Sequence, residues 1–134
     1  DLKDLTPAAA EVILDAVRRL PTSECEVIVV NLGGQVRKIA NDASAFPRRD
    51  IEFIVNVHTR WREPAQDASC TAWARGMFNA LAPHATGTVY VNFMPDDEAD
   101  RVRGASGANY DRLAAIKRRY DPENLFRLNQ NIAS

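Results

Sequence analysis

The chain has 134 residues, and its 17 lysines and arginines against 18 aspartates and glutamates give a formal net charge of −1 at pH 7. This length is typical of a single domain, and the near-zero charge argues against a nucleic-acid-binding protein, which normally carries a basic stripe. No apolar run approaches the roughly 20 residues that span a bilayer. We therefore expect neither a nucleic-acid partner nor a membrane partner.

The N-terminal end bears on the origin of the chain. The sequence begins at Asp1 without an initiator Met, and we therefore expect a fragment of a longer protein. No signal peptide is visible, which leaves the compartment unknown and favours the cytoplasm over secretion.

The first predicted element is an amphipathic helix over residues 7–20. Thr6 suits the N-cap, and Pro7 suits the first helical position, where a backbone N–H has no helical partner in any case. Apolar residues then recur at helical spacing, and Pro21 cannot continue the helix.

Extended segments follow this helix. A β-branched run over residues 25–31 stops at a glycine pair and predicts a strand and a turn, and a weaker alternation over 35–39 indicates a second, shorter strand. Residues 51–61 predict a long strand with one core face and one mixed face that suits solvent, a ligand or another domain. The core face carries Ile51, Phe53, Val55, Val57 and Thr59. The mixed face carries Glu52, Ile54, Asn56, His58 and Arg60.

The second half of the chain adds helices and one more strand. Pro64 opens a helix that Pro83 ends, residues 87–93 alternate as a strand, residues 94–106 have loop composition, and residues 108–120 predict a third helix. This order predicts an α+β fold, an antiparallel sheet with helices packed on one face. A strand missing upstream would leave an unpaired sheet edge, through which two copies can form a homodimer.

Several short motifs carry no specific chemistry. Cys25 and Cys70 lack metal-ligand spacing; they can pair in principle, but two reduced, buried thiols are the simpler interpretation. The acidic cluster over residues 96–98 has no nearby His or spaced carboxylates, so we expect no metal. His58 is either a hydrogen-bonded surface residue or an acid–base group, and His84 has no evident partner.

More specific patterns lie in the C-terminal part. They are Tyr90-Val-Asn-Phe93, Gly107-Ala-Asn-Tyr110, Arg112-Leu-Ala-Ala-Ile-Lys117, Tyr120-Asp-Pro-Glu-Asn-Leu-Phe126 and Asn129-Gln-Asn-Ile132. In this order and at these separations they resemble the C-terminal signature of the berberine-bridge-enzyme-like FAD-linked oxidases, which are PCMH-type flavin oxidoreductases. The substrate-domain pattern of the same family is resembled upstream by Leu32-Gly-Gly34, Phe46-Pro-Arg48, the strand from Phe53 to Trp61, and Trp73-Ala-Arg75.

The resemblance covers most of the chain and implies one compact, ferredoxin-like α+β substrate domain. Within it, residues 1–89 would form the substrate-binding region and residues 90–134 the berberine-bridge-like C-terminal region. Family members oxidise a small organic substrate by hydride transfer to FAD, which is bound mainly by an N-terminal domain. Nothing in this chain resembles that domain, so the chain alone is expected to be inactive.

The resemblance also assigns residues by position. The substrate pocket would be lined by Ile54, Asn56 and His58. The flavin would be approached by Tyr90, Asn92, Asn129 and Gln130. A Tyr that often acts as catalytic base is replaced here by Phe93, which has no proton to exchange, and Ser106 stands where an aromatic residue is frequent.

No catalytic residue is therefore assigned, and it stays open whether the protein is an enzyme. One alternative is a detached, non-catalytic binding or assembly module that pairs with itself or with a separate flavin subunit. Another is a degenerate α+β domain without enzymatic activity.

Overall fold

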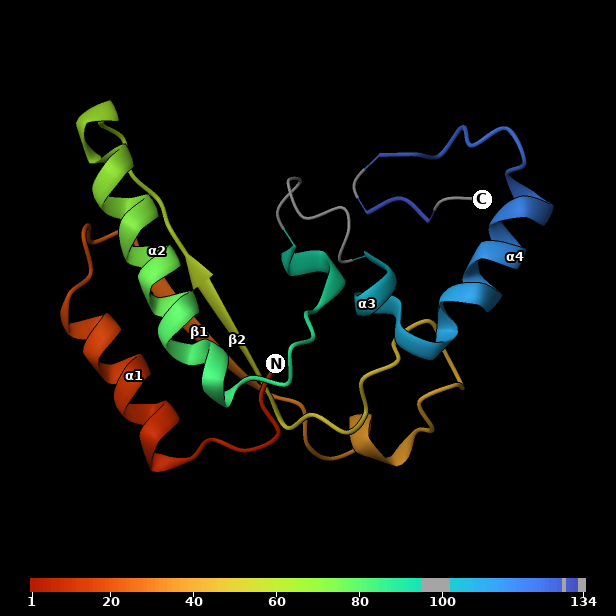
Figure 1. The fold of residues 1–134 in the computed structure, drawn as a ribbon, viewed down its shortest axis with the longest axis horizontal. Coiled ribbons are helices and arrows are strands. Elements are labelled where there is room, and N and C mark those ends of the chain that lie inside the picture. The colour runs from red at the N-terminus through yellow and green to blue at the C-terminus, as the bar shows by residue number, and fades with distance from the viewer. Residues whose placement is uncertain (95–101, 129, 133–134) are drawn as a thin grey trace. The chain divides into compact units, whose positions relative to one another are not determined.

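The computed structural model describes the chain except for residues 95–101, 129 and 133–134 (Figure 1). The chain forms two compact units, each with its own buried core. Their residues are 1–32 with 51–87 for the first unit, and 33–50 with 88–134 for the second. The functional division at residue 90 that the sequence implies stays a prediction.

The first unit is built on an antiparallel hairpin of strands β1 (Glu26–Asn31) and β2 (Phe53–His58). The strands pair in register, with Glu26 opposite His58 at one end of the ladder. Leu2 forms a further bridge to Phe53, and its backbone N–H donates to the Phe53 carbonyl oxygen at 2.8 Å. The N-terminal segment therefore lies beside β2, and the predicted antiparallel pairing is confirmed.

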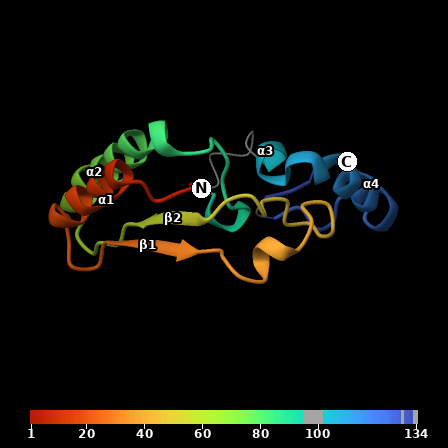
Figure 2. The same ribbon diagram turned by 90° about the horizontal axis from the view of Figure 1, so that it is seen from below.

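Two helices cover one face of this hairpin (Figure 2). Helix α1 (Pro7–Arg18) begins after Thr6, whose side-chain oxygen accepts a hydrogen bond from the Ala9 backbone N–H at 3.2 Å. Helix α2 (Asp67–Leu81) follows a 3-10 turn over residues 64–66. The buried core contains Leu2, Ala9 and Leu81, with Leu5, Val12, Ile13, Phe53, Val55 and Ala85 packed against it. The predicted α+β class, with helices on one face of an antiparallel sheet, is confirmed.

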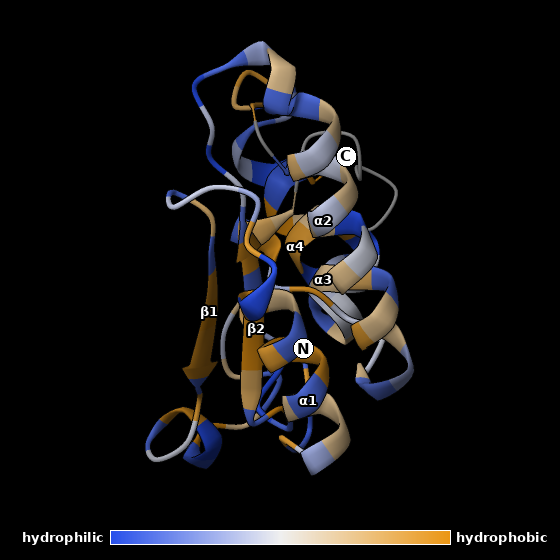
Figure 3. Ribbon diagram, turned by 90° about the vertical axis from the view of Figure 1, so that its left-hand side faces the viewer, coloured by the Kyte–Doolittle hydropathy of each residue, from blue (hydrophilic) through white to orange (hydrophobic). Residues whose placement is uncertain are grey.

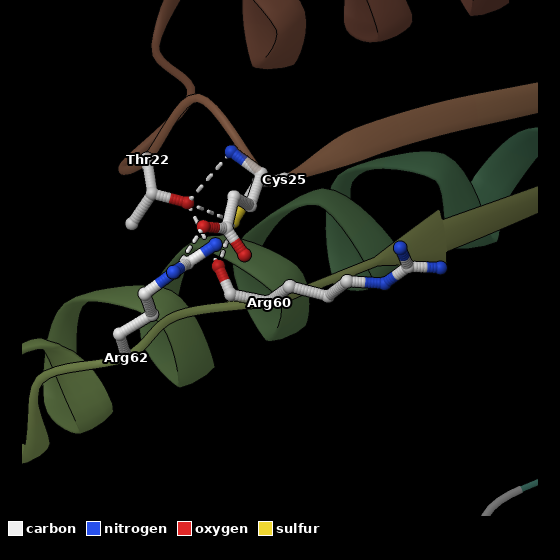
Figure 4. Close-up of polar contacts among 5 residues, drawn as sticks. Thr22, Cys25, Arg60 and Arg62 are labelled. Carbon is white, nitrogen blue, oxygen red and sulfur yellow. Dashed lines mark hydrogen bonds and ion pairs between the residues drawn. The ribbon is translucent and has the colours of Figure 1, made fainter.

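A polar cluster ties the turn after α1 to the segment that follows β2 (Figure 4). The Thr22 hydroxyl donates to the Arg60 carbonyl oxygen at 2.8 Å, and the Cys25 sulfur lies 3.5 Å from the same oxygen. Cys25 and Cys70 are both buried free thiols, as the simpler interpretation predicted. Burial is the main cause that raises the pKa of the Cys70 thiol, so this thiol is kept in its neutral form.

The second unit consists of short helices and irregular segments (Figure 1). Helix α3 (Val102–Ser106) leads through a 3-10 turn into helix α4 (Tyr110–Tyr120). The Asn109 side chain in this turn is buried, and its amide donates to the carbonyl oxygens of Asn41 at 2.8 Å and Ser44 at 3.0 Å. The buried core contains Met94, Val102 and Ala105, with Val89, Val91, Tyr110 and Ile132 packed against it.

Two predicted strands do not form. Residues 35–39 contain a 3-10 helix over Val36–Lys38 instead, because alternation over so few residues does not distinguish a strand from a helical turn. Residues 87–93 end in a 3-10 turn over Val91–Phe93. The alternating valines of this segment pack on the core of the second unit without a strand partner among the described residues.

The expected loop over residues 94–106 is wrong in its last five residues, which form α3. Its acidic cluster lies outside the described residues. The long strand predicted over residues 51–61 is shorter than expected, since only residues 53–58 pair with β1. The helix predicted over residues 108–120 is confirmed as α4 with a preceding 3-10 turn.

Candidate functional site

One face of the hairpin carries the residues that were predicted to line the substrate pocket. Because alternate residues of a strand lie on opposite faces, Phe53 and Val55, which pack on the core, define the face covered by the helices. Ile54, Asn56 and His58 lie on the other face. The register continues that face onto β1. We call it the outer face, and its residues are Glu26, Ile28, Val30, Ile54, Asn56 and His58.

The polar side chains of the outer face form a continuous chain of contacts. Asn56 Nδ2 lies 2.9 Å from His58 Nε2, and His58 Nδ1 lies 3.1 Å from Glu26 Oε1. The Arg60 guanidinium approaches the same carboxylate oxygen at 4.0 Å. The structure therefore brings Asn56 and His58 together as expected by position, and it adds a carboxylate to them.

Ile54 gives this face an apolar end. Its side chain is only 5% exposed, whereas Asn56 and His58 are half-buried. Small-molecule sites usually combine apolar side chains with a few hydrogen-bonding groups. Because Ile54 is almost fully covered by the chain, the exposed apolar side chain of this face is Val30, which is 36% exposed. The roles of Ile54, Asn56 and His58 in substrate binding stay predictions.

Glu26 was missed by sequence reasoning. It stands at the first position of β1, where its own strand gives no sign of a function, and it meets His58 only through cross-strand pairing. An assumed hairpin register that placed Glu26 opposite His58 would have found it, since directly opposite side chains on one face are close enough to interact.

The residues predicted to approach the flavin lie in the second unit. The Tyr90 hydroxyl accepts a hydrogen bond from Asn92 Nδ2 at 2.8 Å, and the Tyr90 ring packs edge-on against Phe93 at a centroid distance of 5.0 Å. Gln130 Nε2 donates to the Met94 carbonyl oxygen at 3.1 Å. Tyr90 and Asn92 are thus in contact, and Asn129 lies outside the described residues.

Near Gln130, one buried acceptor has no hydrogen-bond partner within the part of the chain that the structure describes. It is the side-chain oxygen of Asn131. A buried acceptor without a donor is uncommon in folded proteins and points to a missing partner. Asn131 lines a hollow of about 400 Å³ between α4 and the segment that follows it. The apolar residues around this hollow are Leu113, Ile116, Tyr120, Phe126, Leu128 and Ile132.

Asp121 anchors the segment after α4. Its carboxylate pairs with the Lys117 ammonium and accepts the backbone N–H of Leu125 at 2.7 Å and of Phe126 at 3.1 Å. The hydrogen bond from Lys117 is the largest cause that lowers the pKa of Asp121, and the two backbone N–H groups add to it against the effect of burial. The carboxylate therefore stays ionised and holds the start of an otherwise irregular segment.

The described residues hold neither a clustered metal site nor a membrane-spanning helix. They contain no group of three or more His, Cys, Asp or Glu side chains placed to hold a metal ion. They also contain no helix with the length and apolar character that a membrane crossing requires.

Comparison with known proteins places these observations in a family. Residues 89–133 match the family model described as berberine and berberine like. The FAD-linked oxidoreductase YgaK of Bacillus subtilis, itself uncharacterised, is 31% identical over 130 residues, which are 97% of this chain and 29% of that protein. Berberine bridge enzyme-like 1 of Arabidopsis thaliana is 30% identical over 118 residues, covering 75% of this chain and 22% of that protein.

The fold also matches solved structures. The crystal structure of the glycopeptide hexose oxidase DBV29 in complex with teicoplanin aligns with a TM-score of 0.76 and 25% identity, over 99% of this chain and 31% of that one. Aclacinomycin oxidoreductase gives the same TM-score at 23% identity and supports the fold alone. The chain thus spans less than a third of the length of these relatives. Residues 89–133 form a berberine and berberine-like domain, and almost the whole chain is related to the berberine-bridge-enzyme-like FAD-linked oxidoreductases.

Proposed function

We propose that this chain is the substrate-facing part of an FAD-dependent oxidoreductase that oxidises a small organic molecule by hydride transfer to the flavin. The proposal rests on the side-chain contacts that connect Asn56, His58 and Glu26 on the outer face, beside buried Ile54. The similar FAD-linked oxidoreductase of Bacillus subtilis is about three times as long as this chain, which matches 29% of it. The proposal assigns binding and orientation of the substrate to this face.

Asn56 and His58 supply the polar recognition in this proposal. A side-chain amide can bind a hydroxyl or a carbonyl group, and a neutral imidazole can accept a proton or a hydrogen bond at one nitrogen. Phe93, at the position where the family resemblance implies a Tyr base, has no ionisable group. A proton that leaves the substrate therefore has to be accepted by a group other than Phe93.

The flavin supplies the hydride acceptor when it is bound, and the protein supplies position and polarity. The second unit fits such a group, because the buried Asn131 oxygen lacks a donor beside the Gln130 amide, and the same unit carries the Asn92 amide and the Tyr90 phenol. These groups suit the alternating carbonyl and N–H groups at the polar edge of an isoalloxazine. We propose that Tyr90, Asn92, Gln130 and Asn131 contribute to holding it; the role of Asn129 is carried over from the resemblance alone.

The partner of the second unit in this proposal is the flavin-binding domain. Phe126 is 83% exposed and Leu128 is 87% exposed, and both lie beside the apolar hollow next to α4. Contiguous exposed apolar side chains commonly mark a surface that another protein surface covers. The hydrogen bond from the Phe126 backbone N–H to the Asp121 carboxylate would fix Phe126 in position for that contact.

Asn56→Ala in the full-length flavoprotein tests the proposal. Loss of one hydrogen bond to the substrate should lower kcat/KM about tenfold, the equivalent of roughly 1.4 kcal/mol, with flavin content unchanged. Asn79→Ala is the matched control, since Asn79 is exposed on α2 and should leave kcat/KM as it is. Equal kinetics for Asn56→Ala and the parent protein would remove the outer face from the substrate site.

A second candidate function has one observation in its favour. Strand β1 has β2 as its one neighbour among the described residues, and it is mostly hydrophobic along its length (Figure 3). Exposed edge strands of this kind pair with other strands, so the chain can serve as a non-catalytic module that pairs with itself or with a separate flavin subunit. Sedimentation of the chain as a monomer at all concentrations tested would count against self-pairing.

A further inference from the structure

We propose that Glu26 is a positioning residue for the outer face. Its carboxylate fixes which nitrogen of His58 carries the proton, and His58 in turn fixes the orientation of the Asn56 amide. The inference stands on two contacts, His58 Nδ1 to Glu26 Oε1 at 3.1 Å and Asn56 Nδ2 to His58 Nε2 at 2.9 Å. Its consequence for catalysis rests on the proposed function.

For a neutral imidazole, these contacts assign the protons in a single way. An amide nitrogen can only donate, so Asn56 Nδ2 requires a lone pair at His58 Nε2. The imidazole proton must then lie on Nδ1, where the Glu26 carboxylate accepts it. Glu26 therefore stabilises the Nδ1–H tautomer and keeps Nε2 free to accept the hydrogen bond from Asn56.

The tautomer decides what Asn56 offers to a substrate. With Nδ2 engaged by His58, the side-chain oxygen of Asn56 remains as an acceptor, which binds a hydroxyl or amine hydrogen and repels a carbonyl oxygen. In the opposite tautomer, His58 Nε2 would donate, and the Asn56 amide would have to turn its oxygen to the imidazole. Glu26 thereby selects a substrate with a hydrogen to donate, such as an alcohol or amine, over its oxidised product.

Of the two glutamates near the start of β1, Glu24 and Glu26, it is Glu26 that contacts His58. The Arg60 guanidinium lies 4.0 Å from the Glu26 oxygen and attracts the carboxylate, which keeps its contact to His58. Glu24, two residues earlier, pairs instead with the Arg62 guanidinium at 2.7 Å. Glu24 is exposed and has the same side chain, so it provides a matched control for removal of a carboxylate.

The tautomer can be measured directly in protein labelled with ¹⁵N-histidine, where the signals missing from a His58→Gln variant identify His58. We expect Nδ1 to be protonated in the parent protein, in Glu26→Gln, whose amide oxygen still accepts, and in Glu24→Ala. In Glu26→Ala the Nε2–H form should become populated. A parent protein with Nε2 protonated, or a Glu26→Ala spectrum identical to that of the parent, would overturn the inference.

Kinetics of the full-length flavoprotein separate this inference from the proposed function. Glu26→Ala should lower kcat/KM about tenfold, as expected for one hydrogen bond to a charged group, and Glu26→Gln should restore most of it. The double variant with Asn56→Ala should be no worse than Asn56→Ala alone, because both changes act through one amide. If Asn56→Ala impairs the enzyme and Glu26→Ala does not, Glu26 has no positioning role; if neither does, the proposed function of this face fails.

Discussion

Different interactions stabilise the interior of each of the two units. The first unit buries apolar side chains of two helices against one face of a hairpin, and its core brings Leu2 and Ala9 together with Leu81, more than 70 positions later in the sequence. In the second unit, Asn109 and Asp121 each satisfy two backbone groups of an irregular segment. Both units leave some large apolar side chains exposed, but the most exposed ones lie in the second unit: Tyr120, Leu125, Phe126 and Leu128. The apolar core therefore accounts for more of the first unit than of the second.

Leucine-to-alanine substitutions should show this contrast most strongly. Leu81 is 8% exposed in the core of the first unit, and Leu81→Ala should cost about 2–5 kcal/mol of unfolding free energy through lost burial and a cavity. Leu128 is 87% exposed in the second unit, and Leu128→Ala should change stability by less than about 0.5 kcal/mol. Denaturant unfolding of both variants measures the difference; similar losses for the two would show that the contrast is wrong.

The Asp121 contacts offer a test confined to the second unit. Asp121→Asn should reduce amide-exchange protection at Leu125 and Phe126, because the ionised carboxylate binds both backbone N–H groups and the Lys117 ammonium. Protection in the first unit, for example in β2, should be unaffected. A loss of protection spread evenly over both units would contradict the local role of this carboxylate.

The same carboxylate predicts a pH dependence. Since the pKa of Asp121 is lowered in the folded chain, its contribution is fully present above the unfolded aspartate pKa of about 3.9 and is lost as the pH falls toward the lower folded pKa. Exchange protection at Leu125 should therefore fall in this acidic window. The Asp121→Asn variant should lack that particular step, which makes it the control for other carboxylates.

A smaller effect is expected at the start of α1. Thr6→Ala removes the side-chain oxygen that accepts the Ala9 N–H, and it should cost about 1 kcal/mol of stability in the first unit. Thr6→Ser keeps the oxygen and should restore most of this loss. Thermal unfolding of both variants checks the N-cap, and an unchanged midpoint for Thr6→Ala would show that it contributes nothing.

The local structure of the first unit could be predicted from the sequence better than that of the second unit. The helix after Thr6 and the two faces of β2 could be read from periodicity, because burial on one side imposes a regular pattern. The strand expected over residues 87–93 was wrong, since its valines are partly buried against Met94 and helix α3, and their alternation reflects this burial and no strand pairing. The contact of Glu26 with His58 could not be seen without the strand register, which depends on residues 32 positions apart.

The polar anchors of the second unit were equally hard to predict. Asn109 reaches carbonyl groups of Asn41 and Ser44, more than 60 positions earlier in the chain. No local propensity encodes such a contact. For the C-terminal segment, the ordered motifs indicated the family correctly, and the match to the berberine and berberine-like model confirms it.

The most direct test of the outer face as a substrate site is the rate of flavin reduction in a single anaerobic turnover of the full-length flavoprotein. Mixing with substrate should bleach the flavin about tenfold more slowly in Asn56→Ala than in Asn79→Ala at subsaturating substrate, the loss expected for one hydrogen bond. The oxidised flavin spectra of the two variants should be the same. Equal reduction rates at every substrate concentration would show that the outer face does not meet the substrate.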